Sequence, residues 1–482
     1  METEMIKALR AGDNKRLATI LKATDEADVF DYLTAPGEDS EHNTGLTLVT
    51  QAETLRVILN SFPLQNHRVN LLLSRARANS LFPYRNRLAL FHIFSWENIT
   101  TFERLEQFVN VIRDCLDQGM RMRLMQTPNL NGENFFHWLL KLSHPFSLNE
   151  RIHECVGAVL GLIPQEHREM ILQLPDSKGD SPMLCLMKTD NSKEQIKSVL
   201  RRILELLPEK QAFLQYPHNL EAESLMHLLV KMYSGCSNYA PRGHEHVKTT
   251  MRNCLMQLTV DQISELFHVQ DRNGNGPLHL LGPAADDVME VIKDVKEIAQ
   301  DNQAQLSVKF YECLILENNQ KNTVFHNIGL PTYKKFLENT DHLEDQLQRG
   351  HLISRLLETQ NNDGETILHR TIINCEGFVG NLGDADLTRI LTLKDRSGNT
   401  VIHRICKSCD SNSHDTLIRF LNNIENQAIG ATVLCEPSNS QQPAIHTVCE
   451  NLTNQFLAVL DYLMGSPERI IDVLIAVDPS NY

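Results

Sequence analysis

The sequence predicts an all-α protein built from repeated units of short helices. The clearest evidence is a passage that recurs at residues 270–281, 358–372 and 394–405. In each copy a polar run containing a glycine comes first, and an apolar stretch with a histidine at a fixed offset follows. Glycine permits the backbone conformations that tight turns need, so each copy is typical of a turn that opens a helix. Self-similar units of this size indicate a stacked repeat array.

Weaker copies of this passage extend over most of the 482 residues. Ten positions are equivalent to that of the histidine: 50, 92, 137, 184, 227, 279, 326, 369, 403 and 446. All of them hold histidine except 50 and 184. Successive positions lie 34 to 52 residues apart. We therefore expect about ten units.

The turn followed by a helix start of the type Thr-x-Leu-His resembles the ankyrin repeat, whose period is about 33 residues. Most spacings here exceed that period by roughly ten residues, and the additional residues have a common form. At 164–174, 208–215 and 259–269 a helix-start signal precedes acidic and then apolar residues, which predicts a third, short helix. The resemblance implies an all-α, ankyrin-like solenoid of about ten helix-turn-helix units, many with an extra short helix. Armadillo or HEAT-like stacking is the alternative.

We expect three regions along the chain. Residues 1–36 would form N-terminal capping helices, and residues 37–240 would hold degenerate repeats. Residues 241–482 would hold repeats closer to the motif, followed by C-terminal capping helices. Amphipathic second helices are predicted at 105–116 and 196–207 from their apolar periodicity. Loops are expected where the period fits worst, at 233–247, 282–305 and 375–384.

Composition narrows the classes of function. The formal net charge of −15 and the pI near 5.7 argue against nucleic-acid binding, which requires clustered lysine and arginine. Eleven cysteines scattered without paired spacing suggest reduced thiols in a cytosolic protein. No run of 18 apolar residues occurs, so we expect no membrane span. We also expect a monomer.

The repeat histidines are predicted to be structural, with an imidazole that bonds the backbone of neighbouring turns. The clearest are His137, His279, His326, His369 and His403. We expect no metal and no cofactor. The sequence His244-Glu245-His246 has no recognisable fourth ligand for zinc, and the Cys406-x-x-Cys409 spacing stands alone in a packed helix.

The ankyrin resemblance implies that partner specificity is carried by turn residues that the fold does not dictate. The candidates for protein binding are Asn129, Asn131, Glu133, Arg272, Asn273, Asn275, Asn361, Asn362, Glu365, Arg396, Ser397 and Asn399. Asparagine, aspartate and glycine are also simply the residues that turns prefer, which is the competing interpretation.

The leading hypothesis is a scaffold that binds a partner protein and has no catalytic activity. Its divergent repeats with inserted helices resemble ankyrin-repeat effectors that intracellular bacteria secrete into the host-cell cytoplasm, where the partner would be a host protein. An ordinary eukaryotic ankyrin adaptor is a further alternative. The competing class is an enzyme, a thiol hydrolase that uses Cys236 with His244 or His246 in an insertion loop. No familiar catalytic motif occurs.

Overall fold

The computed structural model describes most of the chain. The described residues are 2–34, 46, 49–74, 90, 101–141, 151–188, 193–236, 242–281, 285–301, 306, 308–331, 333–340, 346–370, 376–379, 382–407, 413–422, 424, 426–440, 442–446, 459 and 462. They divide into two compact units. Unit 1 comprises residues 1–228 and 245–257, and unit 2 comprises residues 229–244 and 258–482.

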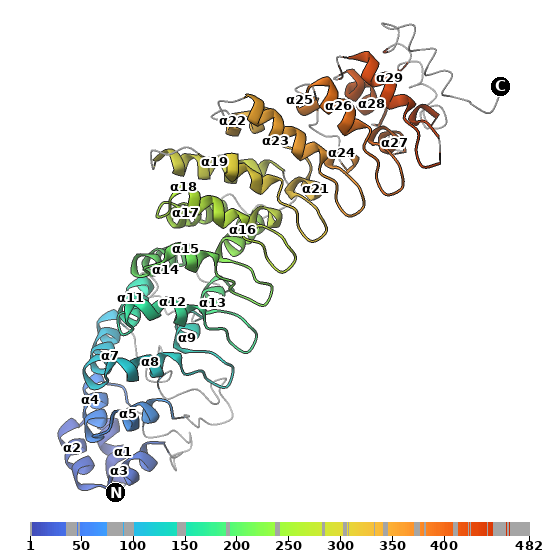
Figure 1. Cartoon of the computed structure of the whole chain (residues 1–482). Helices are drawn as coiled ribbons and strands as arrows, with labels where there is room; N and C mark the ends of the chain where they lie inside the picture. The colour runs from blue at the N-terminus through green and yellow to red at the C-terminus, as the bar shows by residue number, and fades with distance from the viewer. Residues whose placement is uncertain are drawn as a thin grey trace. The chain divides into compact units, whose positions relative to one another are not determined.

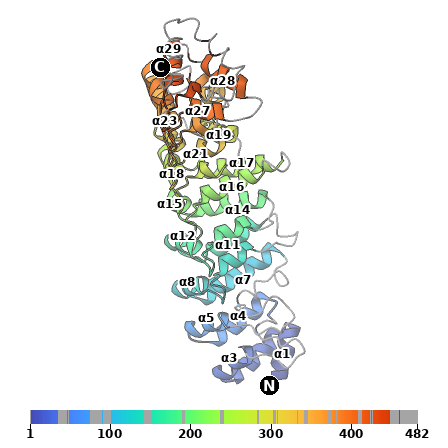
Figure 2. The same cartoon turned by 90° about the vertical axis from the view of Figure 1, so that its right-hand side faces the viewer.

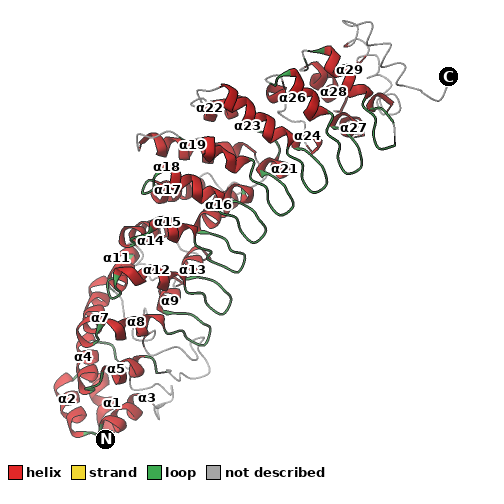
Figure 3. Cartoon of the chain, viewed as in Figure 1, coloured by secondary structure: helices red, strands yellow, loops and turns green. Residues whose placement is uncertain are grey.

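Within the described residues the architecture is helical, with helices joined by turns (Figures 1 and 3). The predicted all-α class, built from repeated units of short helices, is confirmed for the described residues. A repeat consists of a turn, a short first helix, a second helix and a third helix that leads into the next turn. No described helix is long and apolar enough to cross a membrane.

The helices of successive repeats form three sets. The first helices are α9 (Phe135–Lys141), α13 (Pro182–Lys188), α16 (Leu225–Cys236), η2 (Pro277–Leu280), α21 (Val324–Ile328), α24 (Ile367–Arg370) and α27 (Val401–Lys407). The second helices are α4 (Ala52–Ser61), α7 (Phe102–Cys115), α11 (Ile152–Leu160), α14 (Lys193–Leu206), α17 (Arg242–Leu255), α19 (Ala285–Asp301), α22 (Tyr333–Thr340), α25 (Glu376–Val379) and α28 (Ser413–Asn422). The third helices are α5 (Gln65–Leu72), α8 (Gln118–Gln126), α12 (Gln165–Gln173), α15 (Lys210–Gln215), α18 (Val260–His268), α20 (Val308–Tyr311) with η3 (Glu312–Leu314), α23 (Gln346–Glu358), α26 (Asp384–Leu391) and α29 (Gln427–Cys435).

The predicted third helices are therefore confirmed as α12, α15 and α18, and the predicted second helices as α7 and α14. In unit 1, helices α3 (Glu26–Thr34), α5, α8, α12 and α15 form one row, and α4, α7, α11 and α14 form another (Figure 2). The 34-residue spacing between positions 369 and 403 also holds three helices, α24, α25 and α26.

Two of the expected loop regions are largely helical, so those predictions were wrong. Residues 282–305 contain the 17-residue helix α19, whose inward face holds Val288, Val291, Ile292, Val295 and Ile298. Their spacing of three and four residues is the helical period, and it outweighs the polar residues between them. Residues 233–247 contribute to α16 and α17.

Arginines on the third helices tie the repeats together. Arg168, in α12, donates to the carbonyl oxygens of Leu160 and Ile163 in its own repeat at 3.1 Å each, and to Leu206 at the end of α14 at 3.0 Å. Arg68 in α5 donates in the same way to the carbonyls of Phe62 and Cys115. Since the last carbonyls of a helix lack intrahelical partners, one guanidinium satisfies groups in two successive repeats.

The N-terminal residues form three helices, α1 (Glu2–Ala11), α2 (Asn14–Ala23) and α3. Gly12, with φ +64°, makes the turn between α1 and α2. A capping role for these helices stays a prediction. The expected C-terminal capping helices fall almost wholly outside the described residues.

Candidate turn surface

The turns share one hydrogen-bond pattern over five residues. In turn 361–365, the N–H of Asn361 donates to the carbonyl of Glu365 (3.0 Å), and the N–H of Gly364 donates to the carbonyl of Asn361 (2.9 Å). The Asn361 side-chain oxygen accepts the N–H of Glu365 at 3.0 Å. These three bonds recur in turns 129–133, 176–180, 271–275, 318–322 and 395–399. An asparagine or aspartate therefore starts each of these turns.

The fourth residue of each turn has a positive φ. It is glycine at positions 132, 179, 274, 364 and 398, and it is Lys321 (φ 57°) in turn 318–322. Glycine is also required for space, because the next turn lies against it. A Cβ on Gly398 would overlap the side chain of Asn439, and one on Gly179 would overlap Leu220. The missing glycine explains why turn 318–322 was a weak copy in the sequence.

The repeat histidine joins each turn to the next. The backbone N–H of Thr366 donates to His369 Nδ1 at 3.1 Å, so the proton lies on Nε2, which donates to the carbonyl of Asn399 (3.1 Å). The Thr366 hydroxyl lies 2.8 Å from the same Nδ1. Equivalent Nε2 contacts to the fifth residue of the following turn are made by His137, His279, His326 and His403.

Main-chain bonds also connect the turns within each unit. In unit 2 the N–H of Asn319 donates to the carbonyl of Asn273, that of Asn362 to Gln320, and that of Arg396 to Asp363, at 2.7 to 3.0 Å. The bond in unit 1 runs from Ser177 to Asn131. Each time, the second residue of one turn binds the third residue of the preceding turn. The turns of a unit thus form a ladder that fixes their spacing.

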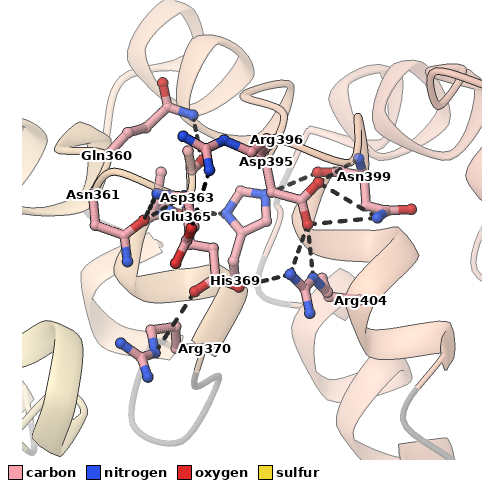
Figure 4. A network of polar contacts seen from close by, with 12 residues as sticks. Gln360, Asn361, Asp363, Glu365, His369, Arg370, Asp395, Arg396, Asn399 and Arg404 are labelled. Carbon is pink, nitrogen blue, oxygen red and sulfur yellow. Dashed lines mark hydrogen bonds and ion pairs between the residues drawn. The ribbon is translucent and has the colours of Figure 1, made fainter. Parts of the chain in front are cut away.

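Charge is balanced where the fifth residue of one turn meets the first residue of the next. Glu365 and Asp395 are both acidic, and Arg404 binds them at 2.6 and 2.8 Å (Figure 4). In unit 1, Lys141 binds Glu133 and Asp176 in the same relation. Two like charges this close would repel each other, so the cation stabilises the junction.

Where two amides meet, they bond each other directly. Asn318 donates to the side-chain oxygen of Asn275 at 2.9 Å, and Asn361 donates to that of Asn322 at 3.0 Å. Arg404 and Arg370 both lie against Glu365.

These contacts shift the acid–base equilibria of the junctions. Burial by itself would raise the pKa of Asp395, but the N–H of Asn399 and the Arg404 guanidinium outweigh it and hold that pKa below its ordinary value. Burial would also raise the pKa of Asp176, but backbone N–H bonds from Lys178 and Asp180 and the charge of Lys141 outweigh it and keep that pKa low. Both carboxylates are therefore ionised in the folded protein at neutral pH.

The predicted binding residues separate into two groups. Asn129 and Asn361 start turns, and Glu133, Asn275, Glu365 and Asn399 end them; all six are buried or half-buried in the junctions. The second and third residues of each turn, which we call the turn tips, are exposed in every described turn. Six predicted residues are turn tips: Asn131, Arg272, Asn273, Asn362, Arg396 and Ser397.

Several turn-tip residues escaped the sequence reasoning, most of them because their turns match the motif poorly. They are Leu130, Ser177, Lys178, Leu220, Glu221, Asn319, Gln320, Asp363, Asn439 and Ser440. An asparagine or aspartate five residues before the Thr-like residue at the start of the first helix would have located most of these turns. The described turns of unit 2 lie side by side (Figure 3).

One cluster of potential metal ligands occurs among the described residues. The ligand atoms of His137, Asp176 and Cys185 lie within 4.8 Å of one another. Both nitrogens of His137 are engaged, however, since Nδ1 accepts a backbone N–H and Nε2 contacts the carbonyl of Asp180. Lys141 already supplies a cation to Asp176, and burial raises the pKa of the Cys185 thiol to about 11. The cluster is suited to a structural junction and unsuited to a metal ion.

The candidate hydrolase residues lie in helices, contrary to the expectation of a loop. Cys236 ends α16, and His244 and His246 lie in the first turns of α17. Their side chains fall outside the described part of the structure, as do those of Cys406 and Cys409.

A scan against protein-family models finds no match for the chain, and a search among curated proteins finds no similar sequence. A search of solved structures finds an ankyrin repeat protein from Leishmania major with 13% sequence identity and a TM-score of 0.39. The match covers 73% of this chain and 97% of that chain. At this identity and TM-score the likeness says nothing about function.

Proposed function

We propose that the chain is a scaffold that binds a partner protein through its turn tips. The observation that supports this is the contrast within each turn. The first, fourth and fifth residues are engaged in the fold, whereas the second and third are exposed at every described turn and differ from one turn to the next. The fold leaves these residues free to vary, and the ladder holds them at fixed spacing. A preorganised row of this kind lowers the entropic cost of binding.

The partner would meet a polar surface in unit 2. The turn tips there include Arg272, Asn273, Asp363, Arg396 and Ser397, so charge of both signs and amide groups are presented together. Such a surface suits a polar protein segment that exchanges hydrogen bonds and ion pairs with several turns. Contacts over successive repeats are the way repeat arrays bind proteins.

The test compares two variants of the full chain. In the tip variant Arg272, Asn273, Arg396 and Ser397 are changed to alanine. In the control variant Lys334 and Glu338, an exposed ion pair on α22, are changed to alanine. A partner captured by the wild-type chain is purified, and its Kd is measured for all three proteins.

We expect the tip variant to bind at least about tenfold more weakly, since loss of a few central contacts typically costs more than 1 kcal/mol. The control should bind as the wild type does. Equal affinities for the tip variant and the wild type would refute the proposal.

We further propose that the chain acts as a monomer in the cytoplasm of a host cell, after secretion by an intracellular bacterium. The support is the resemblance of its divergent, three-helix repeats to such effectors. A translocation reporter fused to the chain, expressed in the source organism during infection, tests this. A signal in the host cytoplasm is expected, and a signal confined to the source cell would refute it.

A further inference from the structure

A cavity of about 470 Å³ lies between α3 and α5 in unit 1, apart from the described turns. The lining residues that matter here are Asp25, Glu26, Phe30, Asp31, Phe62 and Asn70. The phenyl rings of Phe30 and Phe62 meet edge to face, with centroids 6.4 Å apart. His67 also lines the cavity and contacts Glu26, while Asp25 accepts the N–H of Ala27. The cavity therefore combines an aromatic wall with an acidic rim.

The next two helices of the same row, α5 and α8, show which group occupies the equivalent space between them. Arg123, the sixth residue of α8, reaches back to α5 and donates to the side-chain oxygens of Asn66 and Asn70 at 3.3 and 3.2 Å. Those asparagines are the second and sixth residues of α5. Between α5 and α8 the gap is thus bridged by a guanidinium of the chain itself.

Between α3 and α5 that arginine is replaced by a shorter residue. The sixth residue of α5 is Asn70, and the second and sixth residues of α3 are Ala27 and Asp31. All three line the cavity. Asp31 occupies the place in α3 at which Asn70 of α5 accepts the guanidinium, so the acceptor here is a carboxylate. Asn70 occupies the place of Arg123, and its side chain is too short to supply a guanidinium to Asp31.

A second arginine of unit 1 shows that the same groups bind a guanidinium. Arg151 lies over the ring of Phe102, 4.3 Å from its centroid. Its nitrogens also bind Glu103 and Glu154 at 2.6 and 2.7 Å. A phenyl face with two carboxylates is therefore an arginine site in this fold, and the cavity presents the same set of groups.

We propose that the cavity between α3 and α5 binds an arginine side chain of a partner polypeptide. The guanidinium would form a charge-assisted pair with Asp31 and lie against Phe30. Aromatic faces and carboxylates both attract a guanidinium, and a planar donor group fits them better than an ammonium does. This site is independent of the turn tips.

The test uses two small probes that differ in charge and almost nothing else. Nα-acetyl-arginine amide and Nα-acetyl-citrulline amide are titrated into the full chain, and binding is followed by ligand-observed NMR. Two variants are compared with the wild type: Asp31→Asn, within the cavity, and Asp28→Asn, an exposed carboxylate of α3 that does not line it.

The arginine probe should bind the wild type and Asp28→Asn equally, and the citrulline probe should not bind. Asp31→Asn should weaken the arginine probe by about tenfold or more, as expected for loss of a charged hydrogen bond. The proposal would be overturned by equal binding of both probes, by equal effects of the two substitutions, or by no binding of the arginine probe to the wild type.

Discussion

His369 Nε2 lies 3.1 Å from the main-chain oxygen of Asn399, which is 30 residues further along the chain. The same imidazole fixes the start of its own helix through the backbone N–H of Thr366. One side chain thus aligns a helix with the turn of the following repeat. The positions of the exposed turn tips depend on this alignment, because the junctions between successive turns hold the turns in place.

Replacement of His369 by alanine is expected to lower the free energy of unfolding by about 2–4 kcal/mol, since buried polar groups left unpaired cost about 1–3 kcal/mol each. The groups that lose their partner are the Thr366 N–H and hydroxyl, while the Asn399 carbonyl keeps only its bond from the Asp395 N–H. Urea unfolding followed by circular dichroism measures the change. Ser397→Ala, at an exposed turn tip, is the control and should shift the value by less than about 0.5 kcal/mol. Equal losses in both variants would contradict the structural role of the histidine.

The buried histidines predict a pH dependence. Burial lowers the pKa of both His218 and His326 from 6.5 to about 4. The unfolded chain therefore takes up protons near pH 6.5 that the folded chain cannot bind until about pH 4. Stability is fully present above pH 6.5 and declines as the pH falls from 6.5 toward 4.

Urea midpoints measured between pH 7.5 and 4.5 test this, in buffers of constant ionic strength. The wild-type midpoint should fall over the acidic half of the range, and His326→Gln should show a shallower fall. Parallel curves for the two proteins would show that His326 does not contribute.

Arg404→Met is expected to destabilise the protein by about 1–3 kcal/mol, because it removes the cation that binds both Glu365 and Asp395. Addition of Glu365→Gln should recover part of the loss, since it removes one of the like charges. Arg370→Met is the matched control, because Arg370 lies 3.8 Å from the same carboxylate and is 40% exposed. If Arg370→Met cost as much as Arg404→Met, the junction would not depend on the bridging position of Arg404.

Two glycines should respond to alanine in opposite directions. Gly398 has φ +78°, and a Cβ there would overlap Asn439, so Gly398→Ala should cost more than about 1 kcal/mol. Gly350 lies within α23 with no atom near its would-be Cβ, so Gly350→Ala should stabilise the helix by about 0.5–1 kcal/mol. Thermal unfolding of the two variants measures both effects. A stabilised Gly398→Ala would contradict the turn geometry.

Much of the fold could be predicted because its signals are local. The Thr366-x-x-His369 spacing and the glycine of the turn lie within a few residues of each other, and so do the apolar positions of a third helix such as α12. Helix α19 was missed because its polar residues were given more weight than its apolar period.

The junctions could not be predicted, because they join residues about one repeat apart. Asn361 faces Asn322, and Arg404 bridges Glu365 and Asp395, only once the helices are stacked in register. Local sequence could not distinguish Asn361, which is buried, from Asn362, which is exposed. Half of the predicted binding residues therefore start or end a turn and lie in the junctions.

The most direct test of the turn surface is site-specific photo-crosslinking with the full chain. A photoreactive amino acid replaces Ser397, a turn tip, in one protein and Lys334, 86% exposed on α22, in the other. Each is irradiated with the purified partner. We predict a covalent adduct from position 397 and none from position 334. An adduct from position 334 alone, or equal adducts from both, would contradict binding through the turn tips.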